Sequence, residues 1–115
     1  MSSDCIFCKI GKGEIKSDIL DRDDKVFAIK DIHPQAPVHI LVMPFDHIPS
    51  VADLTASTAG LISRMTLMAN GIAKSQGIAE KGYRLTINCG EEGGQTVGHL
   101  HMHLLGGRQM RGGMG

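Results

Sequence analysis

The sequence predicts a single domain in which short β-strands are combined with one long helix. The chain has 115 residues, the size of one domain and enough to bury a modest core without disulfides. Short apolar runs bounded by turn residues recur along it, as is typical of strands. One longer stretch, residues 55–76, repeats its apolar residues with the period of a helix.

The first expected elements are a helical turn and a β-hairpin. Residues 4–10 are compact enough for one helical turn, which the glycines that follow would end. Residues 18–21 and 25–29 are short strand-like runs on either side of a charged turn, so they predict the hairpin. Residues 31–37 contain two prolines and predict a loop, whereas residues 39–43 are apolar enough for a buried strand.

The long helix is expected over residues 55–76. Thr55 or Ser57 can cap its start, and Gly77 can end it. We expect its apolar stripe to face the core, with the two methionines acting as core filler. This stripe consists of Leu61, Ile62, Met65, Met68, Ala69, Ile72 and Ala73.

Two further strands are expected after the helix, over residues 83–88 and 99–105. The second contains His99, His101 and His103 at alternate positions. Because successive side chains of a strand point to opposite faces, these histidines should share one face, each about 6.6 Å from the next. The apolar residues between them would face the core, so we expect the histidines to be displayed at the surface.

The glycine-rich loop before this strand, residues 89–98, favours an anionic ligand. Its backbone amides can approach an anion closely, and the Gln95 amide and Thr96 hydroxyl are further candidate donors. Donors beside imidazoles suit a phosphate-directed catalytic site. The alternative is a metalloenzyme in which the three histidines are zinc ligands, which would also require an open metal position.

Composition argues against several classes of partner. Basic and acidic residues number 12 each, and the chain has no Trp, one Tyr and three Phe. A nucleic acid polymer is therefore not an expected partner, since neither a basic field nor a stacking surface is available. No apolar run is long enough to cross a membrane, and no secretion signal is recognisable. The odd number of cysteines, three, fits a reducing cytoplasm better than a disulfide framework.

Two segments carry a resemblance to a known family. Residues 93–110, GGQTVGHLHMHLLGGRQM, resemble the signature of the histidine triad (HIT) superfamily. Residues 31–44, DIHPQAPVHILVMP, are similar to the branch called histidine triad nucleotide-binding proteins. The resemblance extends from Cys5 to Met110 and thus over nearly the whole chain.

The resemblance implies an α+β fold and an enzymatic activity. The implied fold is an antiparallel sheet of about five strands with one long helix and a short N-terminal helix, paired into a homodimer. It would be a single domain over residues 1–115, with a flexible tail from about residue 108. The implied activity is hydrolysis of the P–N bond of purine nucleoside 5′-phosphoramidates, and also of aminoacyl adenylates, through a covalent nucleotidyl-histidine and without a catalytic cofactor.

The resemblance also implies residue roles. His101 matches the nucleophile, and His39, His99 and His103 match the surrounding histidines. A purine nucleotide would be held by three groups of residues. They are Asp31 and Ile32 at the ribose and base, Asn88, Gly94, Gln95 and Thr96 at the phosphate, and Phe7, Ile10 and Phe27 as apolar walls of the base pocket.

A structural zinc site is a second implication. Some relatives in the superfamily bind zinc with a CxxC pair and two histidines, and Cys5, Cys8, His47 and His99 match those positions. Four such ligands would form a closed site. Alternatively, the two cysteines are reduced packing residues and His47 is a surface residue. Cys89 is expected to be small and buried.

The departures from the family pattern concern the leaving group. Thr96 stands where the nearest relatives have serine, Gly98 stands where an aromatic residue is common, and the tail lacks an aromatic, proline-rich ending. The preferred leaving group therefore stays open. Two alternative functions remain as well. One is hydrolysis of dinucleoside polyphosphates, and the other is a nucleotide-binding regulator whose turnover is incidental.

Overall fold

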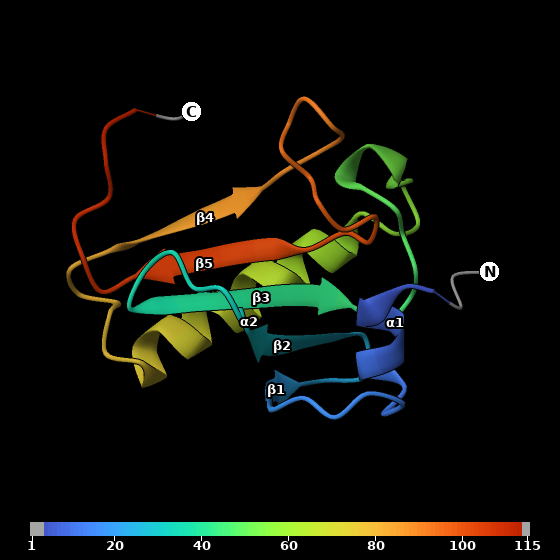
Figure 1. Cartoon of the computed structure of the whole chain (residues 1–115), viewed down its shortest axis with the longest axis horizontal. Helices are drawn as coiled ribbons and strands as arrows, with labels where there is room; N and C mark the ends of the chain where they lie inside the picture. Colours follow the sequence, from blue (N-terminus) through green and yellow to red (C-terminus); the bar gives the residue numbers. More distant parts are fainter. Residues whose placement is uncertain (1–3, 114–115) are drawn as a thin grey trace.

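The computed structural model describes residues 4–113 and consists of one antiparallel sheet with a long helix on one face (Figure 1). The five strands are ordered β1-β2-β3-β5-β4. The α+β fold expected from the resemblance is confirmed. The elements in chain order are α1 (Ile6–Gly11), β1 (Ile19–Arg22), β2 (Val26–Lys30), β3 (Val38–Pro44), the 3₁₀ turn η1 (Val51–Asp53), α2 (Gly60–Ser75), β4 (Tyr83–Ile87) and β5 (Met102–Gly106).

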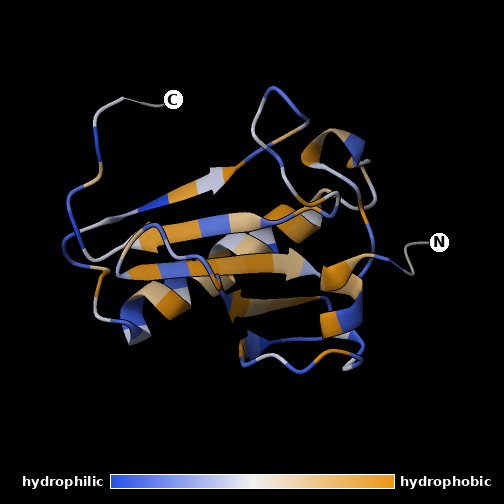
Figure 2. Ribbon diagram, viewed as in Figure 1, coloured by the Kyte–Doolittle hydropathy of each residue, from blue (hydrophilic) through white to orange (hydrophobic). Residues whose placement is uncertain are grey.

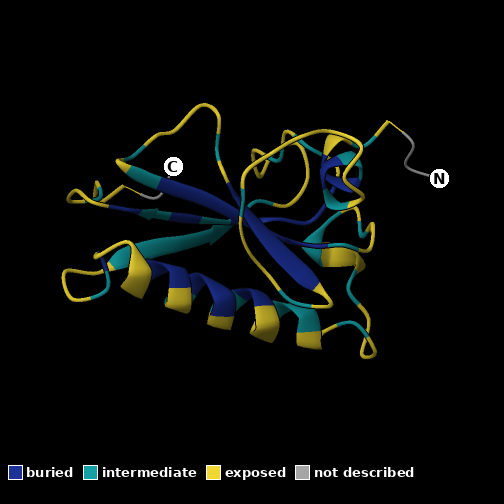
Figure 3. Ribbon diagram, turned by 90° about the horizontal axis from the view of Figure 1, so that it is seen from below, coloured by how far each residue is buried: buried dark blue, intermediate teal, exposed yellow. Residues whose placement is uncertain are grey.

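Helix α2 packs its apolar stripe against one face of the sheet. Figure 3 shows its buried side turned toward the strands and its exposed side turned away. Met65 and Met68 are both buried there, so the expectation that they are core residues is confirmed. The sheet side of this core comes from alternate residues of the central strands, namely Val26, Ala28, Ile40, Val42, Met102 and Leu104.

A smaller apolar cluster lies on the opposite face of the sheet, beneath α1. The strand residues between those of the main core form it, because their side chains point the other way. In Figure 2, β2 and β3 are largely coloured as hydrophobic, as expected for strands covered on both faces. The cluster consists of Phe7, Ile10, Phe27, Ile29, Leu41 and Met43. Since α1 covers only one end of this face, the rest is available for a site.

The two ends of α2 differ from each other in how well the sequence predicted them. The helix begins at Gly60, and its N-cap residue, Ala59, makes no side-chain capping bond. The capping expectation was wrong because Thr55 instead bonds with Thr58 in a separate turn. Gly77, with φ of +76°, does end the helix. Its N–H donates to Lys74 at 3.1 Å, a bond that satisfies a carbonyl of the last turn.

Strand β5 begins at Met102 rather than at residue 99. The segment before it is bent, because His99 N–H donates to the carbonyl of Val97 at 2.9 Å and Leu100 N–H donates to that of Ile48 at 2.7 Å. The expectation that the histidines are displayed was wrong for two of them. His99 and His101 are buried, with 0% and 6% of their surfaces exposed.

Three smaller points complete the fold. Cys89 is exposed, so the expectation of a buried cysteine was wrong. Within residues 4–113, neither helix has the length and apolar character that crossing a bilayer requires. The last strand leads into a C-terminal tail, of which residues 114–115 lie outside the described part. Within the described part of this tail, the carbonyl of Arg111 accepts a hydrogen bond from the Arg84 guanidinium at 2.8 Å.

Candidate functional site

His101 is held in one tautomer by the backbone. Its Nδ1 lies 2.8 Å from the carbonyl oxygen of His99, and because a carbonyl only accepts hydrogen bonds, Nδ1 carries the proton. The lone pair is therefore on Nε2. The ring of Phe7 packs edge-on against His101 with centroids 5.2 Å apart, and the ring of His103 lies 5.0 Å away. The neutral form of His101 thus presents an oriented nitrogen lone pair, as a nucleophile requires.

Asp31, His39 and His103 form a second group, here called the carboxylate cluster. His39 Nε2 lies 2.9 Å from His103 Nδ1 and 3.3 Å from Asp31 Oδ2. The backbone N–H of Gln35 donates to His39 Nδ1 at 3.0 Å, so His39 carries its proton on Nε2. His39 therefore donates to His103 Nδ1, and the proton of neutral His103 is on Nε2.

Burial keeps the carboxylate cluster histidines uncharged. Burial, followed by the neighbouring His101 and His39, lowers the pKa of His103 to about 4, although Asp31 acts in the opposite direction. Burial likewise lowers the pKa of His39, and the Asp31 carboxylate opposes that shift only in part. Protonating His39 on Nδ1 would also break its hydrogen bond from Gln35. Near pH 7, His103 is thus a neutral hydrogen-bond donor through Nε2.

Cys5, Cys8, His47 and His99 form a third group, here called the thiol cluster. His99 Nδ1 lies 3.3 Å from Cys5 Sγ and 3.5 Å from Cys8 Sγ, and His47 Nδ1 lies 3.3 Å from Cys8 Sγ. The four candidate ligand atoms are all within 4.8 Å of one another. His99 Nε2 donates to the carbonyl of Pro44 at 2.8 Å, so the Nδ1 lone pair faces the sulfur atoms. This donor set fits a tetrahedral zinc ion.

His99 therefore belongs to two arrangements at once. Its ring faces the thiol cluster, while its carbonyl fixes the proton of His101. Burial is the main cause that lowers the pKa of His99, and the hydrogen bond to Pro44 partly opposes it. The three histidines that the sequence places on one face are thus divided between different neighbours.

The glycine-rich loop is organised by its own side chains. The Gln95 amide donates to the carbonyls of Pro49 and Val97 and accepts from the Gly90 N–H. Both hydrogens of this amide are occupied, contrary to the expectation that it is a free donor, because Gln95 instead joins the loop to the segment before η1. Thr96 is exposed, and its hydroxyl forms no hydrogen bond within residues 4–113.

The remaining loop residues that the resemblance assigns to the phosphate also lie at this turn. Asn88 Nδ2 donates to the carbonyl of Gly93 at 2.7 Å. Gly94 has φ of +82°, a conformation that favours glycine. The backbone of the loop therefore depends on Asn88 and on the glycines, and its exposed surface carries the Thr96 hydroxyl.

The residues expected to wall the base pocket lie at different depths. Phe7 and Ile10 are buried in the apolar cluster beneath α1. Phe27 is fully buried and packs against Phe45 with centroids 4.6 Å apart, so it supports this cluster from below. Ile32, by contrast, is 83% exposed beside Asp31 and is accessible to a ligand.

Sequence reasoning missed several residues beside His103, among them Arg84, Thr86 and Arg108. A cavity of about 280 Å³ there is lined by Gln35, His39, Arg84, Thr86, Asn88, His103, Leu105, Arg108 and Met110. Alternation along residues 83–88 could have placed Arg84 and Thr86 on one face. Only the register of β4 against β5 places that face beside the histidines.

Comparisons with known proteins agree with this geometry. The HIT domain family model matches residues 12–110. The chain is 51% identical to the purine nucleoside phosphoramidase of Escherichia coli over 110 residues, covering 96% of this chain and 92% of that protein. It is 49% identical to an uncharacterised HIT-like protein of Synechococcus elongatus, with 96% of each chain covered.

Solved structures show the same fold. A HIT family hydrolase from Clostridium thermocellum has a TM-score of 0.96 and 49% identity, with 99% of both chains covered. A HIT family hydrolase from Legionella pneumophila has a TM-score of 0.93 and 42% identity, with 96% of this chain and 99% of that chain covered. The site geometry, the family match and these likenesses together show that the chain is a hydrolase that belongs to the histidine triad (HIT) family.

Proposed function

We propose that the protein hydrolyses the P–N bond of purine nucleoside 5′-phosphoramidates, with His101 as the nucleophile. The observation that carries this proposal is the hydrogen bond from His101 Nδ1 to the His99 carbonyl, which leaves Nε2 as a free nucleophile. The likeness to a purine nucleoside phosphoramidase over 96% of the chain supports the substrate class. Aminoacyl adenylates, which also carry AMP on a leaving group, are the further expected substrates.

The reaction proceeds in two displacements at phosphorus. The Nε2 lone pair of His101 attacks, and the electron pair of the P–N bond moves to the nitrogen, which takes a proton from solvent and departs as an amine. A water molecule then attacks the phosphorus of the nucleotidyl-histidine. The P–N bond to His101 breaks, its electron pair returns to Nε2, a proton passes to solvent, and AMP is released.

The neighbouring donors stabilise the charge on the phosphate oxygens. His103 donates through Nε2, because His39 occupies its Nδ1. The Thr96 hydroxyl and the amides of the glycine-rich loop supply further donors on the side of Asn88 and Gly94. None of these donors has to gain or lose a proton, so they are oriented before the substrate binds.

The nucleoside binds toward α1 in this proposal. The Asp31 carboxylate accepts hydrogen bonds from the ribose hydroxyls, and Ile32 contacts the base together with Phe7 and Ile10. Asp31 is suited to this role because its Oδ1 already accepts from the His33 N–H at 2.8 Å, which fixes the carboxylate. Phe27 supports the apolar wall from beneath.

Steady-state kinetics test the proposal directly. The rate of AMP release from an adenosine phosphoramidate should exceed the rate of cleavage of a diadenosine polyphosphate. Faster cleavage of the polyphosphate would favour the dinucleoside polyphosphate hydrolase instead. If replacing His101 removes turnover without altering the protein's behaviour in cells, the nucleotide-binding regulator becomes the better description.

We also propose that the thiol cluster holds a structural zinc ion. Its two sulfur and two imidazole ligands would link α1 to the segments after β3 and before β5, and zinc would stabilise that connection. Metal analysis of protein prepared without a histidine tag should give about one zinc per chain. A Cys8→Ser variant should lose the zinc, whereas a Cys89→Ser variant should keep it. Zinc well below one per chain in the wild type and in Cys89→Ser would contradict the site.

A homodimer in the cytoplasm is the remaining proposal. Strand β4 is an edge of the sheet, and Leu67 on the outer side of α2 is 70% exposed. The two surfaces adjoin, because the Tyr83 hydroxyl donates to Asn70 at 2.7 Å. Light scattering should give twice the chain mass, and Leu67→Lys should reduce it to one chain. The thiols of the proposed zinc site fit a reducing compartment.

A further inference from the structure

We propose that Arg108 is a positioning residue for the hydrolysis. It anchors residues 31–37, here called the proline loop, and through this loop it fixes the hydrogen-bond direction of His39 and His103. Arg108 itself touches neither the nucleotide nor the departing amine in this proposal. The inference rests on the proposed function and adds a residue that prepares the phosphate donor before the substrate binds.

The proline loop is held mainly by its own hydrogen bonds. The Asp31 N–H donates to the carbonyl of His39 at 3.0 Å, and Asp31 Oδ1 accepts from the His33 N–H at 2.8 Å. The Gln35 side-chain amide donates to the carbonyl of His33 at 3.1 Å. All these bonds stay within residues 31–39. They fix the shape of the loop, but they do not connect its outer end, at Gln35, with the rest of the molecule.

Packing gives that outer end little further support. Residues 32–35 are exposed. A cavity of about 140 Å³ is lined by Pro34 and Pro37 of the loop and by Ile40 and Gln76 from β3 and the end of α2. Side chains that border an unfilled space lose the dispersion contacts that a filled core would supply. The position of the outer end therefore depends on hydrogen bonds from elsewhere.

The chain after β5 reaches the proline loop because of Gly107. Val38 is paired with Gly106, so the two segments run side by side at this end of the sheet. Gly107 has φ of +92°, and a Cβ atom there would lie 2.9 Å from Cβ of Pro37. Only glycine allows both that conformation and that approach. The next residue, Arg108, therefore starts directly beside the loop.

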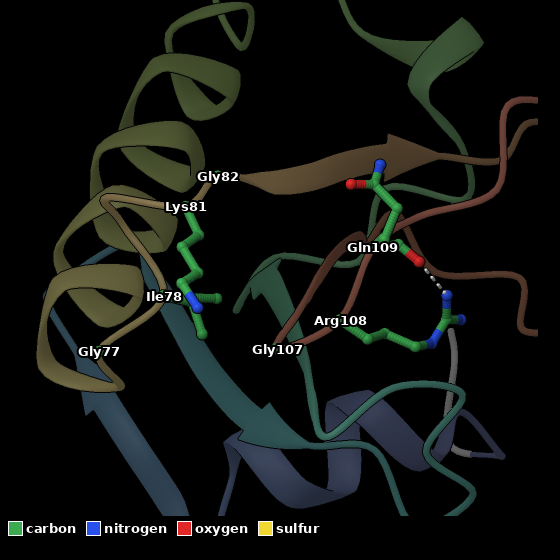
Figure 4. Close-up of a pocket in the computed structure, with 7 residues that line it drawn as sticks. All are labelled: Gly77, Ile78, Lys81, Gly82, Gly107, Arg108 and Gln109. Atoms are coloured by element: carbon green, nitrogen blue, oxygen red, sulfur yellow. Dashed lines mark hydrogen bonds between the residues drawn. The ribbon is translucent and has the colours of Figure 1, made fainter.

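The Arg108 guanidinium connects the two segments. Its Nη2 donates to the carbonyl of Gln35 at 2.9 Å, and its Nη1 donates to that of Gln109 at 3.0 Å. Figure 4 shows the guanidinium pointing away from Lys81, with a dashed line to Gln109. Arg108 forms no ion pair within residues 4–113. Among the described residues, its bond to Gln35 is the one hydrogen bond that joins the proline loop to a segment outside residues 31–39.

The anchored residue is also the one that orients His39. The Gln35 N–H donates to His39 Nδ1 at 3.0 Å, while the Gln35 carbonyl accepts from Arg108. These two backbone groups are separated only by the two backbone torsions of Gln35, so holding the carbonyl restricts the direction of the N–H. His39 Nε2 in turn donates to His103 Nδ1 at 2.9 Å. Arg108 thus acts on the tautomer of His103 through Gln35 and His39.

Kinetics with adenosine 5′-phosphoramidate test this role, because its departing group is ammonia. Ammonia carries no substituent, so a loss of rate cannot come from a contact between Arg108 and a larger amine. Arg108→Gln should lower kcat about threefold with little change in KM, because the donor is less well oriented. Arg108→Lys should recover part of the rate, since its ammonium can still donate to the Gln35 carbonyl.

Arg111→Gln is the matched control. It removes the same charge from an exposed position three residues further along the same tail. The Arg111 side chain forms no ion pair within the described residues, and the substitution keeps its backbone carbonyl. This variant should therefore have the kcat and KM of the wild type.

A double variant tests whether Arg108 acts through His39. Interaction energies between two residues appear as non-additive effects of their substitutions. Arg108→Gln in the His39→Ala background should leave kcat at the value of His39→Ala alone, because the residue that transmits the effect is missing. A further threefold loss, of about the size seen in the single variant, would show that Arg108 acts independently of His39 and would overturn the inference.

Nitrogen NMR of the ligand-free protein separates this inference from the proposed function, since it requires no turnover. His103 should be the Nε2–H tautomer in the wild type and in Arg111→Gln, and Arg108→Gln should add a population of the other tautomer. An unchanged His103 spectrum in Arg108→Gln overturns the inference and leaves the phosphoramidase proposal standing. A raised KM with unchanged kcat also overturns it, because Arg108 would then bind the substrate directly. No hydrolysis by folded wild-type protein contradicts the proposed function instead.

Discussion

The thiol cluster and the carboxylate cluster place histidines in similar surroundings, but their hydrogen bonds prepare them for different chemistry. Both contain two imidazoles in contact with potentially anionic groups. In the thiol cluster, the Pro44 carbonyl accepts a hydrogen bond from His99 Nε2, so the lone pair on His99 Nδ1 points toward two sulfur atoms. In the carboxylate cluster, the Gln35 amide turns the proton of His39 toward His103. In each cluster, one hydrogen bond to the backbone thus fixes a histidine tautomer. In the thiol cluster that tautomer directs a lone pair at the sulfur atoms, and in the carboxylate cluster it directs an N–H at His103.

His101 lies between the two clusters, and replacing it should cause the largest loss of turnover. His101→Ala should lower kcat for an adenosine phosphoramidate by about three orders of magnitude or more, because the neighbouring imidazoles of His39, His99 and His103 carry their protons on Nε2. Binding of AMP, measured by calorimetry, should persist. His33→Ala, at an exposed histidine, is the control. Turnover near that of the wild type would show that the nucleophile is a different residue.

Removing metal should affect the thiol cluster and spare the tautomers of the carboxylate cluster. If zinc is bound, a strong chelator should lower the unfolding temperature by about 10 °C, since the ion connects three segments of the chain. Differential scanning calorimetry measures the change. The Cys5→Ser variant should already show the lower temperature and should respond little to chelator. An equal response in the variant and the wild type would place the metal elsewhere.

Removing the donor of the carboxylate cluster should have an intermediate effect on turnover. His39→Ala should lower kcat about tenfold, because His103 Nδ1 loses its donor and the ring can adopt the other tautomer. His39→Gln should recover part of the rate, since its amide can donate. Nitrogen NMR of His103 should report the Nε2–H tautomer in the wild type and a mixture of tautomers in His39→Ala. An unchanged spectrum in His39→Ala would show that another group fixes His103.

The smallest expected effect is the dependence of stability on pH. The pKa of His103 is lowered to about 4, so its contribution is complete above the unfolded value of about 6.5 and is lost as pH falls toward 4. The free energy of unfolding should therefore decrease from pH 7.5 to pH 5.5. The slope is at most about 1.4 kcal/mol per pH unit for one histidine, and less for the half-buried His103.

Urea unfolding at several pH values checks this slope. His103→Asn should flatten it, whereas His33→Asn should not, because His33 is exposed. A slope that is unchanged in His103→Asn would assign the pH dependence to other groups.

The sequence predicts the strands, and which histidines and cysteines lie close together, better than it predicts the surroundings of those residues. Apolar periodicity located α2, yet the first turn of the predicted helix forms separately, because Thr55 finds a partner in Thr58. Alternation predicted one face for the three histidines. It failed at residues 99–101 because Leu100 pairs with Ile48, a contact between distant parts of the chain that no local pattern reveals.

The same limit applies to the cavity lined by Arg84 and Arg108 and to the glycine-rich loop. Arg84 lies 19 positions before His103 in the sequence, and only the pairing of β4 with β5 brings the two residues together. Gln95 has the residue type of a phosphate donor, but a partner 46 positions earlier, Pro49, already occupies its amide. Local patterns identify chemical groups, whereas long-range pairing decides which of them stay available.

The use of the His99 carbonyl to orient His101 has a consequence for how the two clusters can change independently. A main-chain acceptor is present whatever side chain occupies position 99. Substitutions of Cys5, Cys8 or His47 that preserve the local backbone therefore leave this acceptor in place. The proposed metal site and the proposed nucleophile are adjacent in space, but the first could be lost in evolution while the second is retained.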